Sequence, residues 1–157
     1  MAEAEEVSAF IRNAEEQLVD AEVTPRSGRY HLSFLCSALS AESASSALII
    51  ALGRRTSRKH RNWMILGEIH ANLSGRLGTT VRELSLKLHE IEPHIPKLLR
   101  YPFRFKEKWL IPSEYYTKKM AEDVLRKAKQ IPKLTKKVPK RAVKRRVTRI
   151  RHYGSKL

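Results

Sequence analysis

Apolar residues recur at intervals of three and four along most of this chain, the spacing that places one apolar stripe along a helix. No segment shows the strict apolar and polar alternation that marks a half-buried strand. Because such stripes are buried when helices pack against one another, the pattern predicts an all-α fold. We expect about five helices. The first four span residues 7–21, 26–52, 63–73 and 80–91, and the fifth, capped by Ser113 or Thr117, extends to residue 131.

Residues that start and end helices set these bounds. Thr24 followed by Pro25 predicts the start of the second helix, and Gly53 predicts its end. Residues 80–83, Thr-Val-Arg-Glu, have the spacing of a capping box and predict the start of the fourth helix. Four prolines between positions 93 and 112 predict an ordered but irregular connection, without strands, ahead of the last helix.

The middle of the second helix, residues 36–47, consists almost entirely of serine and alanine. Small side chains of this kind allow another helix or another subunit to approach closely, so a homodimer is one expectation. The only cysteine, Cys36, lies in this run, which excludes a disulfide framework and a cysteine-based metal site. We expect Cys36 to be a small buried side chain.

Charge is distributed unevenly along a chain whose net charge is +16. Residues 1–24 carry a net charge of −6, whereas residues 132–157 contain eleven bases and no acid. A like-charge block of this density repels itself and is typical of an arm that binds an anionic partner. We therefore divide the chain into a helical domain, residues 1–131, which Pro132 closes, and a basic nucleic-acid-binding tail, residues 132–157.

The tail also carries a weak helical pattern. Val143, Val147 and Ile150 recur at intervals of four and three, so we expect the tail to become helical only when its charges are neutralised. This apolar face is too small to insert into a membrane. An acidic N-terminus and the lack of a continuous apolar run of about 18 residues predict neither a signal peptide nor a membrane span, and hence a cytoplasmic protein.

Basic side chains gather in the loop after the second helix, in the proline-rich connection and in the tail. In the connection, four aromatic residues between positions 101 and 109 alternate with bases, a pattern typical of a surface that stacks on single-stranded nucleic acid. Packing of these rings beneath the connection explains the pattern equally well. The four aromatic residues are Tyr101, Phe103, Phe105 and Trp109, and the candidate nucleic-acid-binding residues are Arg54, Arg55, Arg58, Lys59, Arg61, Arg100, Arg104, Lys136, Lys137, Lys140, Arg141, Lys144, Arg145, Arg146, Arg149 and Arg151.

Two groups of residues carry a family resemblance. The first is a helix of the type Phe-Ile-x-x-Ala-Glu-x-x-Leu-x-x-Ala at residues 10–21, then the small-residue helix that ends at residues 48–53, then His60. The second is the pair of Arg-Tyr-Pro and Tyr-Thr elements within residues 100–117. Together they resemble the HEPN domain family, small up-and-down helical bundles found widely in archaea and bacteria. The resemblance covers roughly residues 5–131 and implies this bundle, with the basic tail as an addition.

The resemblance also raises the question of ribonuclease chemistry. Many family members carry an Arg, four to six other residues and a His near the start of the last helix, where the His would move the proton of a 2′-hydroxyl and the Arg would stabilise the phosphate. This pair is missing here, because the next histidine after Arg100 and Arg104 is His152. Arg55 and His60 remain as weak catalytic candidates. For His60 we favour helix capping or phosphate contact.

The sequence contains no phosphate-binding GxxxxGK[ST] loop and no HExxH pair, so we expect no cofactor and no metal. It therefore predicts a non-catalytic RNA-binding protein, with ribosomal RNA as one candidate partner. Two alternatives stay open. One is a metal-independent HEPN-type ribonuclease or toxin. The other, which the resemblance implies, is the partner subunit of a nucleotidyltransferase.

Overall fold

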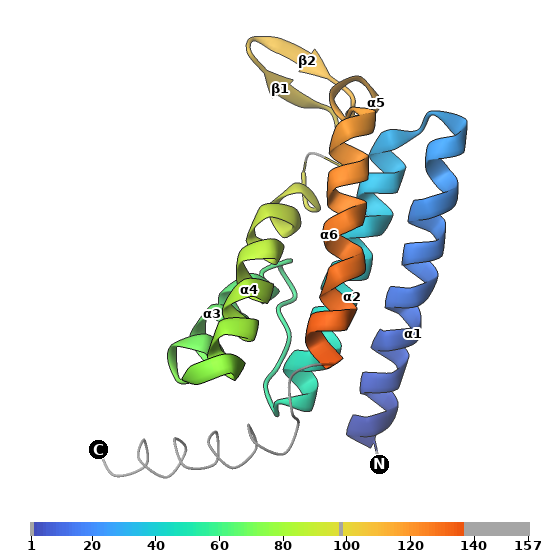
Figure 1. Ribbon diagram of the computed structural model, residues 1–157. Helices are drawn as coiled ribbons and strands as arrows, with labels where there is room; N and C mark the ends of the chain where they lie inside the picture. Colours follow the sequence, from blue (N-terminus) through green and yellow to red (C-terminus); the bar gives the residue numbers. More distant parts are fainter. Residues whose placement is uncertain (1, 98, 137–157) are drawn as a thin grey trace.

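The computed structural model describes residues 2–97 and 99–136, and the fold of this part of the chain is an all-α bundle, as the apolar periodicity predicts (Figure 1). Helices α1, α2 and α6 lie side by side. Helices α3 and α4 form a pair that packs against α2 and α6 on the side away from α1. The helical elements are α1 (Ala2–Val23), the 3-10 turn η1 (Thr24–Ser27), α2 (Tyr30–Ala51), α3 (Asn62–Ala71), α4 (Gly75–Ile91), the 3-10 turn η2 (Glu92–His94), α5 (Pro112–Tyr115) and α6 (Lys118–Lys136).

The serines of α2 explain how closely α1 packs against it. Ser33 donates its hydroxyl hydrogen bond to the carbonyl of Ala21, and Ser40 donates to the carbonyl of Ala14, both at 2.7 Å. A short side chain reaches the backbone of a neighbouring helix only where the two helices lie close together. The helix that exploits the small residues of α2 is thus α1 of the same chain.

Helix α2 is long and apolar enough, by length and composition alone, to cross a membrane. Most of it is buried inside the bundle. It shares one core with Leu84 and Leu88 of α4 and with Val124 of α6. Burial in that core accounts for its apolar composition.

Three of the predicted helix starts are wrong. Helix α1 begins at Ala2, five residues before its apolar stripe. Residues 24–27 form the 3-10 turn η1, and α2 begins at Tyr30, after Gly28 has turned the chain at a positive φ of 73°. Helix α4 begins at Gly75, so residues 80–83 lie inside it. There the Thr80 hydroxyl donates to the carbonyl of Arg76 instead of capping a helix. At residues 24–27 the Pro25 signal starts only a short turn that Gly28 ends, whereas residues 80–83 lie inside a helix whose Gly78 and Val81 are buried.

The last helix begins at Lys118, after Thr117, whose Oγ1 accepts a hydrogen bond from the backbone N–H of Met120 at 3.3 Å, and it ends later than predicted. Helix α6 contains Pro132 and ends at Lys136. Pro132 cannot donate to the carbonyl of Ala128, which weakens the helix at this point. Leu134, however, is only 8% exposed and belongs to the main core, so its burial favours continuing the helix. The rest of the predicted tail, residues 137–157, lies outside the described residues.

The expectation for Cys36 is only partly correct. Its side chain is half-buried rather than buried, and it forms no disulfide. Burial raises the pKa of the Cys36 thiol, with a smaller contribution from the negative charge of Asp20. A raised pKa lowers the fraction of thiolate at neutral pH, so this cysteine is an unreactive one.

The proline-rich connection contains a β-hairpin, so the expectation of no strands is wrong for residues 103–110. Strand β1 (Phe103–Phe105) pairs in antiparallel fashion with β2 (Lys108–Leu110). Strands of three residues are too short to show a recognisable alternation in the sequence. The turn residues Lys106 and Glu107 both have positive φ, 45° and 68°, as a two-residue type I′ turn requires.

Glu107→Gly is expected to stabilise the protein by about 1 kcal/mol, because glycine adopts a positive φ without the steric strain that a Cβ atom causes. Urea unfolding would measure the change. Glu107→Ala is the matched control, since it removes the same carboxylate but keeps the Cβ atom. Equal stabilities of the two variants would show that the turn is not strained.

Candidate nucleic-acid interface

The β-hairpin has two different faces, because successive side chains of a strand point to opposite sides. Arg104 and Trp109 lie directly opposite each other in the pairing, so they share the outer face. Both are exposed, and Trp109 has 72% of its surface accessible. Arg104 makes no ion pair or hydrogen bond with the part of the chain that the structure describes. An exposed indole beside an unpaired guanidinium is suited to stack on a base and bind its phosphate.

The inner face of the hairpin is anchored to the bundle. The rings of Phe103 and Phe105 each lie 5.2 Å from the ring of Tyr115, edge to face. Tyr115 in turn contacts Tyr116, whose ring lies 4.8 Å from Phe34 of α2. The two phenylalanines thus lie on the side of Tyr115, where Phe103 is half-buried and Phe105 remains 41% exposed, whereas Trp109 faces solvent. Packing accounts for Phe103, and stacking of Trp109 on nucleic acid stays a prediction.

Tyr116 is fixed in place by a hydrogen bond to the half-buried His94. Its hydroxyl lies 2.8 Å from Nδ1 of His94, and only 3% of Tyr116 is exposed. Burial raises the pKa of Tyr116 and lowers the pKa of His94. Both groups are therefore neutral near pH 7, and the pair joins the end of α4 to the start of α6 without buried charge. This pair gives the hairpin a rigid base.

Tyr101 and Arg100 extend the exposed surface next to the hairpin. Tyr101 is 56% exposed, and the guanidinium of Arg100 lies 5.7 Å from the centre of the Tyr101 ring. Lys106 lies over the ring of Phe105 at a similar distance, 5.5 Å. Such cation–π contacts at exposed sites contribute about 0.5–1 kcal/mol each. They hold the basic groups close to the aromatic rings.

The basic loop, residues 54–61, is the second candidate region. Ser57 shapes it, because its Oγ accepts hydrogen bonds from the backbone N–H groups of Lys59 and Arg61, at 3.0 and 3.2 Å. Arg54 is used structurally, in an ion pair with Glu68 at 2.8 Å. The other four bases of the loop are exposed and make no ion pair with a described residue; they are Arg55, Arg58, Lys59 and Arg61.

His60 contacts an acid and not its sequence partner Arg55. Its Nδ1 lies 2.9 and 3.0 Å from the two carboxylate oxygens of Glu42 on α2. Within the described residues, no hydrogen bond or ion pair joins Arg55 to His60. The geometry gives His60 a structural partner and leaves the catalytic role of this pair a prediction.

A buried polar junction lies beneath this loop. The carboxylate of Glu92, which is fully buried, accepts hydrogen bonds from the backbone N–H groups of Asn62 and Trp63, the first residues of α3, at 3.2 and 2.9 Å. The side-chain amide of Asn62 donates to the hydroxyls of Ser45 and Ser46, at 3.1 and 2.8 Å. Glu92 thus caps α3 from the end of α4, and Asn62 joins both helices to α2.

Burial raises the pKa of Glu92 to about 7, and the two backbone hydrogen bonds oppose this rise. The sequence gives no signal for this role. Glu92 stands 30 positions from Asn62, and an acid at the end of a helix has no recognisable pattern.

The structure places the two basic regions at opposite ends of α2. The hairpin lies near the end where α2 begins, and the basic loop follows its last residue, Ala51 (Figure 1). Since α2 has 22 residues, these ends are about 33 Å apart. Lys136, the first tail candidate that the structure describes, lies at the same end as the loop, where it lines a groove together with Ala51. The other tail candidates lie outside the described residues.

Residues 2–97 and 99–136 contain no group of three or more His, Cys, Asp or Glu side chains that could hold a metal ion. The family model of the HEPN domain matches residues 7–138. The chain belongs to the HEPN domain family. Comparison with curated proteins and with solved structures gave no match.

The HEPN match begins within α1 and ends two residues beyond α6, so it includes the hairpin and all of the described helices except the first five residues of α1. The basic residues from Lys140 onward lie beyond it. In this HEPN chain the start of the last helix carries no histidine, and the half-buried His94 is the nearest one before it in the sequence.

Proposed function

We propose that this HEPN protein binds single-stranded RNA without cleaving it. In this proposal, Trp109 stacks on an unpaired base while the basic loop and the tail bind phosphates. The observation that carries it is the outer face of the hairpin, where a largely exposed indole lies across from an unpaired arginine. Exposed tryptophans make large contact areas at low entropic cost, which is typical of binding surfaces.

The charge distribution supports a polyanion as the partner. Residues 137–157 contain nine bases and no acid, in addition to the four unpaired bases of the loop. Each phosphate that they neutralise releases condensed counterions, which gives strong binding at low salt. Five of the tail bases are arginines, which bind phosphate through two hydrogen bonds and stack on bases: Arg141, Arg145, Arg146, Arg149 and Arg151.

The surroundings of the histidines support the absence of cleavage. A general base must reach the 2′-hydroxyl with a free nitrogen, and a neighbouring cation must reach the phosphate. Glu42 holds Nδ1 of His60, which leaves Nε2 as its second nitrogen, but no contact among the described residues brings Arg55 to His60. His94 is bound to Tyr116 in the core. Neither histidine is arranged as the base of a nuclease with an arginine beside it.

Trp109→Ala is expected to raise the Kd for unpaired RNA about tenfold, because stacking of one base on an aromatic ring contributes roughly 1–3 kcal/mol. Fluorescence anisotropy with a labelled single-stranded RNA would measure it. Met64→Ala is the matched control, since Met64 is also an exposed apolar residue but lies on α3. Equal affinity of Trp109→Ala and the unmodified protein would contradict the proposal.

Tryptophan fluorescence should report the stacking of Trp109 on RNA directly. The chain has two tryptophans, and Trp63 packs against His89, so Trp63→Phe leaves Trp109 as the only indole. Addition of single-stranded RNA should quench the fluorescence of this variant. A perfectly paired RNA duplex should quench it much less, because its bases are not free to stack.

A further inference from the structure

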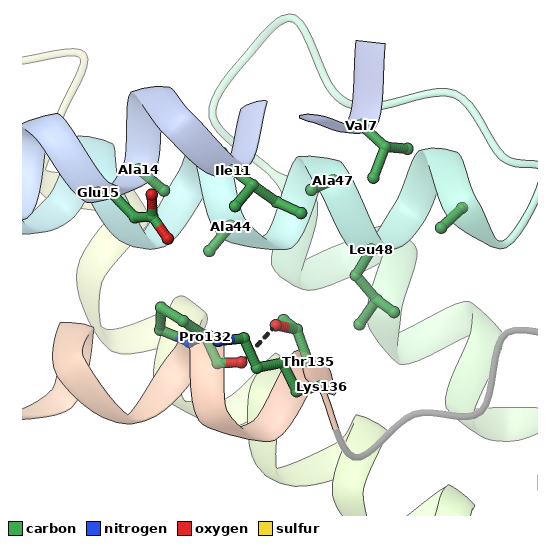
Figure 2. A pocket seen from close by; sticks show the side chains of 11 residues that line it. Val7, Ile11, Ala14, Glu15, Ala44, Ala47, Leu48, Pro132, Thr135 and Lys136 are labelled. Atoms are coloured by element: carbon green, nitrogen blue, oxygen red, sulfur yellow. Dashed lines mark hydrogen bonds between the residues drawn. The ribbon is translucent and has the colours of Figure 1, made fainter. Parts of the chain in front are cut away.

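An apolar groove lies between α1, α2 and α6 at the end of the bundle where α6 stops (Figure 2). Helices α1 and α6 both pack on α2 but contact each other little, and alanines on α1 and α2 leave the space between them unfilled. The groove has a volume of about 640 Å³, including space open to solvent. Ile11 and Leu48 line its floor and wall, with Pro132 opposite.

Two charged side chains line this groove, Glu15 of α1 and Lys136 at the end of α6. Glu15 lines it directly, next to Ile11, which remains 40% exposed. Glu15 makes no ion pair with any described residue. Neither do three other exposed acids of α1, Glu5, Glu6 and Glu16. Farther along the helix, where α1 does meet α6, Glu22 is paired with Lys129 at 2.5 Å. The groove end of α1 therefore presents negative charge that the described part of the bundle does not neutralise.

The chain itself supplies a complementary segment at this point. Lys136, the last residue of α6, lines the groove, and residues 137–157 continue directly from it. That segment carries nine bases, no acid, and the apolar residues Val143, Val147 and Ile150 at helical spacing. The segment is positively charged, whereas the acids of α1 are negatively charged. Its apolar residues can pack on the apolar side chains of the groove.

We propose that residues 137–150 dock into this groove, with their apolar side chains on Ile11 and Leu48 and their bases beside the unpaired acids of α1. The attachment at Lys136 makes the docking intramolecular, so its effective concentration is in the millimolar range. In the proposed function, on which this step rests, the same bases bind RNA. RNA must therefore displace the tail from α1. The acidic helix then acts as an internal competitor that rejects weak polyanions.

Cross-linking of the full-length chain tests the docking without RNA. In a Cys36→Ser background, Ile11→Cys places one thiol in the groove and Val147→Cys places the other in the tail. Val19→Cys replaces Ile11→Cys in the matched control, because Val19 is an exposed α1 residue outside the groove. Eleven residues separate Lys136 from Val147, a reach of up to about 36 Å, so the tail can meet either thiol.

With a short bis-maleimide reagent at about 1 µM protein, the Ile11 variant is expected to form the intramolecular cross-link about tenfold faster than the Val19 control. Equal rates would overturn the docking. Cross-linked dimers in place of monomers would also overturn it, in favour of the tail of a second copy. Glu15→Gln combined with Glu16→Gln should slow the reaction, as should 1 M salt.

A second arm of the experiment adds single-stranded RNA. The cross-linking rate should fall toward that of the control as RNA displaces the tail. If anisotropy shows that RNA is bound but the cross-linking rate does not change, RNA does not compete with α1 for the tail. That result would leave the docking itself intact. Failure of the RNA to bind at all would contradict the proposed function and leave the docking result intact.

Discussion

Truncation after Lys136 is expected to raise the Kd for single-stranded RNA about 1000-fold at 0.15 M salt. The truncation removes nine of the chain's bases and leaves every described helix complete. If six of these bases contact phosphates, about four counterions are released on binding, which contributes roughly 4–5 kcal/mol at this salt concentration. Filter retention or fluorescence anisotropy of both proteins would measure the change.

The matched control for the truncation keeps the charge of the tail and changes its chemistry. Replacing the five tail arginines with lysines preserves all nine charges, so the loss should be about tenfold or less. Circular dichroism of the truncated protein should show an unchanged helical bundle. An unchanged affinity after truncation would mean that the tail does not bind RNA and would leave the hairpin and the basic loop as the only interface.

Glu92→Ala is expected to destabilise the protein by roughly 2–4 kcal/mol, because it leaves the N–H groups of Asn62 and Trp63 without an acceptor and opens a cavity in the junction. Glu90→Gln is the matched control. Glu90 also lies near the end of α4, but it is exposed and forms a surface ion pair with Lys127, so its loss should cost about 1 kcal/mol or less. Urea unfolding at pH 7 would separate the two effects.

The raised pKa of Glu92 also predicts a dependence of stability on pH. The folded protein keeps this carboxyl protonated up to about pH 7, whereas the unfolded chain releases the proton near pH 4.5. Folding therefore takes up a proton between these values, so this group's contribution to stability is fully present below pH 4.5 and declines, by up to roughly 3 kcal/mol, as the pH rises to 7.

Glu92→Gln isolates this contribution, because glutamine does not titrate. Burial lowers the pKa of His31 and of His94, so their contribution runs the other way and is lost as the pH falls below about 6.5. The unmodified protein and the Glu92→Gln variant both contain these histidines, so their contribution cancels in a comparison of the two. The free energy of unfolding of the unmodified protein, relative to that of Glu92→Gln, should therefore fall as the pH rises from 5 to 7.5. A constant difference would show that Glu92 is already ionised in the folded state.

The sequence predicted the bundle itself but not every element within it. The stripe from Val7 to Ala21 and the small-residue run of α2 identify two helices that pack closely, and the structure confirms both. Helix starts were less predictable, because the Thr80 capping signal competes with packing that extends α4 back to Gly75. The hairpin could not be predicted, since neither its three-residue strands nor its turn at Lys106 carries a typical signal.

The candidate interface was likewise predicted only in part. The aromatic and basic residues of the connection were identified as a group, but only the pairing register separates the inward Phe103 and Phe105 from the outward Trp109. The role of Glu92 was missed, because it depends on a contact with Asn62 across 30 positions. For His60, the contact with Glu42 across 18 positions was not predicted, and the capping or phosphate role stays a prediction.

The central claim is that the intact protein binds RNA and leaves it whole, and one filter-retention experiment with end-labelled single-stranded RNA tests both parts. The fraction of RNA retained should fall steeply with salt, with a slope of log K against log salt of about −4 for six phosphate contacts. The RNA recovered from the filter should run at full length on a denaturing gel. RNA that passes through the filter at low salt, or that is recovered in shorter pieces, would contradict the account.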